Sequence, residues 1–189
     1  MSELSDTITE AAEQGGRNRI HALVAICVAI TATFMALCNV KDGNIVQAMQ
    51  QAQARYIDGW SYFQAKSTKQ SMAENTLALL KTASGDSAVA GIKKYTAEIA
   101  RYDREKSEIK KEAEGHQAEY DALNVFDDQF DMTEALLSIS IALFGITALT
   151  NSRWLLWFAM SLSAGGFVLG ITAFMKISLH SDWVANILS

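Results

Sequence analysis

The chain has 189 residues, 50% of them hydrophobic, with no proline and a formal net charge of −5. A chain without proline lacks the strongest helix breaker, so this composition favours an all-α protein built from a few long helices. No dense basic patch accompanies the negative net charge, and we therefore expect no nucleic-acid partner.

Charged residues are absent from three segments, residues 20–38, 135–150 and 154–175. About 20 apolar residues in a helix match the roughly 30 Å hydrocarbon core of a bilayer. The second segment reaches this length when it begins at residue 133. We therefore predict transmembrane helices at 20–38, 133–150 and 154–175. The first is longer than the apolar region of a signal peptide, so we expect it to remain as an anchor.

The N-terminal tail, residues 1–19, has an acidic amphipathic pattern. Leu4 and Ile8 lie one helical turn apart on one face, and we expect this short helix to end at Gly15–Gly16. After the first membrane helix, residues 41–44 form a turn-like cluster, which predicts a kink at the membrane surface.

The segment between the first two membrane helices carries most of the charge. Apolar residues recur there at steps of four and three, over residues 45–63 and again over 92–130. Between these stripes, Gly85 suits a helix C-cap and Ser87 suits an N-cap. We therefore predict a long antiparallel, coiled-coil-like hairpin over residues 39–132.

The hairpin stripe also contains polar residues. Lys66, Gln70, Lys106 and Asp127 fall on the predicted seam, where two helices alone would bury them poorly. A further partner surface, from another copy or another protein, is therefore expected.

Membrane orientation is predicted from positive charge in the short flanking segments. Arg17, Arg19 and Arg153 would all be cytoplasmic if the N-terminus is inside, and we favour this orientation with the hairpin outside. Residues 151–153 predict a tight turn, and residues 176–189 predict a segment lying in the membrane interface.

One acidic cluster invites a catalytic reading. Asp127, Asp128 and Asp131 have the spacing of a diphosphate-binding metal motif, but no second acidic motif accompanies them. A solvated acidic collar at the headgroups is the favoured interpretation, and metal-dependent activity at these residues is the alternative. The sequence predicts no enzyme, no metal site and no cofactor, and it identifies no small-molecule substrate.

Two sequence features indicate that the chain associates with other helices or other proteins. Gly166 and Gly170 form a small-xxx-small pair, which lets membrane helices approach closely. The same pairs also serve packing within one chain. On the hairpin, four aromatic residues cluster, and at least one ring should lie outside the seam. The predicted partner or oligomer interface therefore comprises Tyr56, Trp60, Tyr62, Phe63, Gly166 and Gly170.

Two functions follow from these patterns. The first is a non-enzymatic membrane protein with a structural or interaction role, which self-associates or docks as an accessory subunit on a larger membrane complex. The alternative is a pore or transport subunit formed by oligomerisation. Its pore would be lined by hydroxyl side chains, which otherwise serve helix packing or bond to their own backbone: Ser138, Ser140, Thr147, Ser161 and Ser163.

Two segments resemble a known family. Residues 60–67, Trp-Ser-Tyr-Phe-Gln-Ala-Lys-Ser, resemble the W-x-Y-[YF]-Q-A-K-S signature of the bacterial membrane proteins grouped as domain of unknown function 4337. Residues 148–157 look like that family's basic turn into its last helix. The resemblance implies the same architecture of one membrane helix, a helical middle and two further membrane helices. It also implies the bacterial cytoplasmic membrane, and it supplies no activity.

Overall fold

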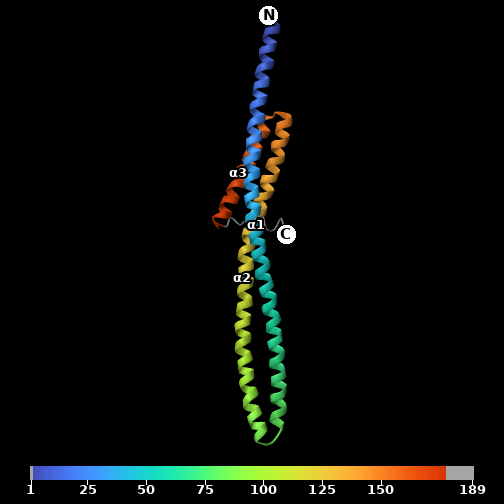
Figure 1. Cartoon of the computed structure of the whole chain (residues 1–189), viewed down its shortest axis with the longest axis vertical. Coiled ribbons are helices and arrows are strands. Elements are labelled where there is room, and N and C mark those ends of the chain that lie inside the picture. Colours follow the sequence, from blue (N-terminus) through green and yellow to red (C-terminus); the bar gives the residue numbers. More distant parts are fainter. Residues whose placement is uncertain (1, 178–189) are drawn as a thin grey trace. The chain divides into compact units, whose positions relative to one another are not determined.

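The computed structural model describes the backbone of residues 2–177 and the side chains of residues 19–177. It contains three helices in this range, α1 (Ser2–Thr82), α2 (Asp86–Thr150) and α3 (Arg153–Phe174) (Figure 1). The prediction of an all-α protein is confirmed. All three helices include a stretch long and apolar enough to cross a membrane.

Helix α1 is continuous over 81 residues. The predicted helix end at Gly15–Gly16 is therefore wrong, and residues 41–44 also lie within the helix. A glycine inside a helix costs only about 1 kcal/mol, and no proline is present to remove a backbone donor. Most of the predicted interfacial segment 176–189 lies outside the described residues.

The chain divides into two compact units. The three-helix unit comprises Met1–Val46 and Asn124–Ser189, and the hairpin unit comprises Gln47–Leu123. The three-helix unit contains parts of α1 and α2 together with α3. The hairpin unit contains the remaining parts of α1 and α2.

The three-helix unit packs large side chains of α2 against small residues of α3. Phe130, Leu137 and Phe144 of α2 are among the largest fully buried side chains. On α3, the buried positions include Ala159 and Gly166. Small residues on one helix let the large side chains of the next fill the space between them.

Polar side chains of this unit point inward. Thr31 of α1 and Ser163 of α3 are buried and share a hydrogen bond of 3.0 Å between their hydroxyl oxygens. The hydroxyls of Thr133, Ser140 and Thr147 donate to backbone carbonyls four residues earlier on α2. These bonds satisfy the buried hydroxyls without any partner helix.

Large apolar side chains of the same unit point outward. They belong to all three helices and are at least two-fifths exposed: Leu23, Ile26, Ile30, Leu37, Ile139, Ile146, Leu149, Trp154, Trp157, Phe158, Val168, Ile171 and Phe174. The unit therefore has an apolar core and also an apolar outer surface, whereas a soluble domain rarely leaves so many large apolar side chains exposed together.

Left-handed residues end two helices of the unit. Asn151, with a φ of 52°, follows α2, and its N–H donates to the carbonyl of Thr147. Lys176, with a φ of 57°, follows α3, where it and Ile177 donate to carbonyls of the last turn in a Schellman arrangement. The predicted turn before the last helix is confirmed, although Arg153 already belongs to α3.

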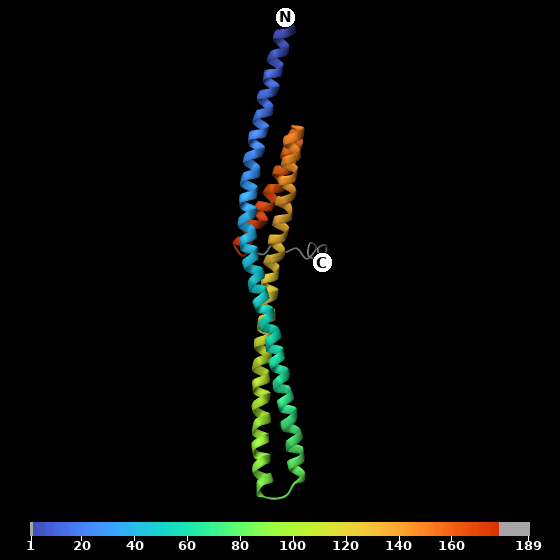
Figure 2. The same ribbon diagram turned by 45° about the vertical axis from the view of Figure 1, so that its right-hand side comes forward.

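The hairpin unit is an antiparallel pair of helical arms, which lie side by side in both views (Figures 1 and 2). The arms are joined at Gly85, whose φ of 122° is strained for any other residue. Its carbonyl accepts the first hydrogen bonds of α2, so Ser87 does not act as the predicted N-cap. At mid-length, a Cβ on Gly59 would lie 3.0 Å from the Cβ of Ala113, so glycine lets the arms approach closely there.

Candidate functional site

The predicted aromatic residues form two groups on the first arm of the hairpin unit. Tyr56, Trp60 and Phe63 lie on one face, with ring centroids 6.3 Å apart for the first pair and 5.3 Å for the second. Both contacts are edge-to-face, a favourable arrangement of aromatic rings. Tyr62 points elsewhere and is 53% exposed. Of the four, it therefore offers the most surface to a partner.

Tyr62 also lines a shallow groove of about 480 Å³ on the hairpin. The groove contains groups of both charges, including Arg55, Asp58 and Glu112, around the close approach of Gly59 to the other arm. Mixed charge beside an exposed ring is typical of a rim that contacts another protein. The groove could not be predicted from the sequence, because its residues come from both arms.

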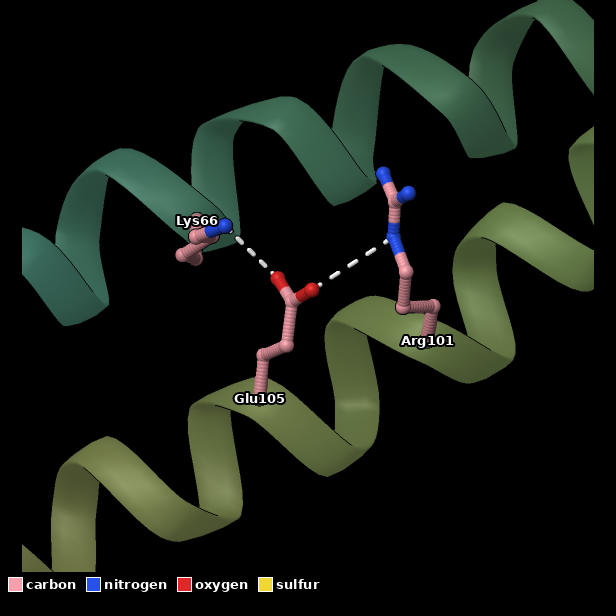
Figure 3. Close-up of polar contacts among 3 residues, drawn as sticks. All are labelled: Lys66, Arg101 and Glu105. Atoms are coloured by element: carbon pink, nitrogen blue, oxygen red, sulfur yellow. Dashed lines mark hydrogen bonds and ion pairs between the residues drawn. The ribbon is translucent and has the colours of Figure 1, made fainter.

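A charged network crosses the arms next to Tyr62. Lys66 Nζ lies 2.6 Å from Glu105 Oε2, and Arg101 Nε lies 3.5 Å from the other oxygen of the same carboxylate (Figure 3). Lys66 also lies over the rings of Tyr62 and Tyr102, 5.1 Å and 5.7 Å from their centroids. The lysine is thus held by one carboxylate and two aromatic rings.

These contacts shift the proton affinities of the pair in opposite directions. The hydrogen bond to Glu105, and then that to Tyr62, raises the pKa of Lys66. The hydrogen bond from Lys66 lowers the pKa of Glu105. Both groups therefore stay charged across the neutral range, and their ion pair links the two arms.

The predicted seam residue Gln70 also finds partners within the hairpin. It is buried, and its amide nitrogen donates to Glu74 and Asp103, both at 2.9 Å. Lys106 lies 3.9 Å from Asp103 and over the ring of Phe63. Several polar groups of the seam are therefore paired inside one chain, whereas the side-chain oxygen Oε1 of Gln70 is buried without a hydrogen-bond partner among the described residues.

A different face of the first arm carries unpartnered apolar side chains. Ile57, Met72 and Leu79 are 55%, 65% and 72% exposed. At 100° per residue they lie within about 60° of one another, on the side opposite Gly59. We call these three residues the outer stripe. The sequence could have indicated this stripe, because its three residues are apolar and fall outside the heptad-like pattern.

The predicted glycine pair lies inside the three-helix unit. A Cβ on Gly166 would come within 2.6 Å of Leu137 Cδ2, and one on Gly170 within 2.7 Å of the Phe34 ring. Phe34 is itself stacked on Phe167, with centroids 4.4 Å apart. These glycines therefore serve packing of α3 on α1 and α2 in the same chain, which was the alternative left open by the sequence.

The acidic cluster lies in the same unit, where α1 meets α2. Burial and the charges of Asp127 and Asp131 raise the pKa of Asp42 to about 6. Burial and Asp131 also raise the pKa of Asp127, although its hydrogen bond with Asp42 opposes this. The pair can thus hold one proton between two carboxyls. Among the described residues, no group of three or more acidic, histidine or cysteine side chains is arranged to hold a metal ion.

Comparison with known families supports the architecture. Residues 20–176 match the family model described as Domain of unknown function (DUF4337). The chain belongs to this family. The match covers all three apolar helix segments and the hairpin of this DUF4337 chain. Searches of curated proteins and of solved structures found no match.

Proposed function

We propose that this DUF4337 chain is an integral membrane protein with a structural or interaction role and no enzymatic activity. The observation that carries the proposal is the apolar outer surface of the three-helix unit. Thr31 and Ser163 bond to each other inside it, while large side chains such as Ile26 and Leu149 face outward. A hydrocarbon environment favours this distribution, because it leaves apolar side chains in lipid and pairs polar groups internally.

Charge at the ends of the unit supports an orientation. Arg19 and Arg153 lie together at one end. Asp42, Asp127 and Asp131 interact at the meeting of α1 and α2, near residue 40. We propose that the arginine end is cytoplasmic, because positive charge is retained on that side. The hairpin unit then lies outside the cytoplasm.

The hairpin unit is the proposed interaction element, acting through the outer stripe and Tyr62. The chain then self-associates, or docks as an accessory subunit on a larger membrane complex. Apolar side chains that stay exposed on a polar arm are typical of a surface that another protein covers. In the described part of the chain, no observation specifically favours the alternative of a pore.

To test the proposal, the chain is extracted in mild detergent. The mass of the extracted assembly is then determined, and every co-purifying protein is identified. We expect either a homogeneous assembly of this chain or a stoichiometric second protein. The variant Ile57→Ser/Met72→Ser should release the partner or reduce the assembled mass. A matched control is Gln64→Ser/Asn75→Ser, which changes exposed polar residues on the same face. A bare monomer for the unaltered chain would refute the interaction role.

A further inference from the structure

A groove of about 380 Å³ lies at the end of the three-helix unit where α3 begins. Arg19 of α1 and Arg153 of α3 contribute its charged groups. Its remaining lining is apolar and includes Leu23, Trp157 and Met160. Two arginines thus lie beside an apolar groove. This arrangement is complementary to a phospholipid, which joins an anionic headgroup to an apolar chain.

The two arginines lack a counter-ion in the described part of the chain. Every ion pair between described residues lies within the hairpin unit, so neither Arg19 nor Arg153 takes part in one. Residues 20–38 and 154–175, which continue from these arginines, contain no acidic residue. Guanidinium groups bind phosphate oxygens in a bidentate manner, and this pair is available to do so.

The aromatic residues at this end fit the same ligand. Trp157 lines the groove and is 68% exposed, and Trp154 one turn earlier is 73% exposed. Tryptophan is enriched at the boundary between headgroups and acyl chains. A soluble phosphate would use the arginines alone and leave Leu23, Trp157 and Met160 uncovered. The apolar lining therefore points to a lipid.

We propose that this groove binds one anionic phospholipid of the bilayer. Its phosphate lies between Arg19 and Arg153, and one acyl chain lies along Leu23, Trp157 and Met160. The proposal rests on the membrane insertion proposed above. It adds a specific lipid site to that function, at the end assigned to the cytoplasm, where basic pockets between membrane helices meet anionic headgroups.

Native mass spectrometry of the detergent-solubilised full chain tests the site, with phosphatidylglycerol and phosphatidylcholine supplied as probes. One basic residue near an anionic surface contributes about fivefold in affinity, so two arginines predict a preference for phosphatidylglycerol of about 25-fold. Arg19→Gln/Arg153→Gln should abolish the preference. Lys41→Gln/Lys176→Gln removes the same charge from residues outside the groove and should preserve it. Equal retention of both lipids, or equal loss in both variants, would overturn the proposal.

Two further measurements separate a built site from diffuse attraction. Leu23→Trp places a bulkier side chain in the groove and keeps both arginines, so the variant should retain less phosphatidylglycerol while its helicity by circular dichroism is unchanged. Brominated phosphatidylglycerol should quench tryptophan fluorescence more than brominated phosphatidylcholine does, and Trp157→Phe should remove most of the difference. Soluble glycerol phosphate should not compete with the lipid. If Leu23→Trp retains as much lipid as the unaltered chain, or glycerol phosphate displaces the lipid, the acyl-chain part of the proposal is wrong.

Alkaline carbonate extraction distinguishes this proposal from the function on which it rests. A chain that carbonate releases from membranes is not inserted, and both proposals then fail. A chain that stays in the membrane fraction but shows no preference for phosphatidylglycerol loses only the lipid site.

Discussion

Replacement of Gly170 by alanine tests how the three-helix unit is held together. The added Cβ would lie 2.7 Å and 2.8 Å from two ring carbons of Phe34, and 3.0 Å from Thr133 Cγ2. Carbon atoms pack best at about 3.5–4.0 Å, so the ring would have to move by about 0.8 Å. Phe34 cannot move freely, because it stacks on Phe167 and also lies beside Phe174, with centroids 6.4 Å apart.

The expected cost follows from two opposing terms. Overpacking a filled core costs about 1–3 kcal/mol. Alanine in place of glycine within a helix gains up to about 1 kcal/mol. With the full gain, the net destabilisation by Gly170→Ala is about 0–2 kcal/mol, and we expect a value near the middle of this range, about 1 kcal/mol. Gly165→Ala is the matched control, because a Cβ there meets no atom within 4 Å. It carries only the favourable term and should be neutral or stabilising.

The free energy of unfolding of both variants is measured in mixed detergent micelles, with circular dichroism as the signal for helix content. Phe34→Leu removes the ring and should recover much of the stability lost in Gly170→Ala. The mass of the assembled protein should not change, because Gly170 packs inside one chain. Equal stability of the Gly170 and Gly165 variants would refute the close packing of α3, and so would a Gly170→Ala protein that loses only its oligomeric state.

Three further predictions concern polar contacts. A double-mutant cycle of Thr31→Val and Ser163→Ala, read by the same unfolding assay, should give a coupling of about 0.6 kcal/mol, and no coupling would contradict their hydrogen bond. The raised pKa of Asp42, about 6, means that its protonated form favours folding. Stability should therefore increase as the pH falls from 7 to 5, by about 1 kcal/mol after allowance for solvent near a partly exposed carboxyl, and Asp42→Asn should flatten this slope. Lys66→Gln should lower Tm, whereas Lys66→Arg keeps the positive charge beside Glu105 and over the two tyrosine rings and should largely preserve it; equal Tm values for the two variants would contradict a stabilising contact.

The sequence was sufficient for the larger part of the fold. Three charge-free segments and the absence of proline predicted the helices, and Gly85 marked the hairpin loop. The end of α2 at Thr150 agrees with the turn predicted at residues 151–153, and Asn151 adopts a left-handed conformation there. These features depend on local chemistry, which a single sequence records directly.

Packing partners could not be predicted in the same way. Gly15–Gly16 looked like a helix end, yet two glycines cost too little to stop a helix in a chain with no proline. The pair Gly166 and Gly170 indicated a close approach, but only the structure shows that Leu137 and Phe34 make it. A pattern of small residues predicts that another helix packs closely against them, but it does not identify that helix.

The distribution of hydroxyl groups bears on the choice between an interaction protein and a pore. A pore built from several copies needs a polar face on the outside of each three-helix unit, where water can line it. Ser140, Thr147 and Ser163 are instead buried within one chain. Of the five hydroxyls considered for a pore, only Ser138 and Ser161 are exposed, and Ser161 donates to its own backbone. The outward surface around them is dominated by large apolar side chains, which suit lipid or another protein and would not hold a column of water. The structure of the described residues therefore favours the interaction role, and measurement of ion flux in liposomes that contain the purified chain provides the opposing test.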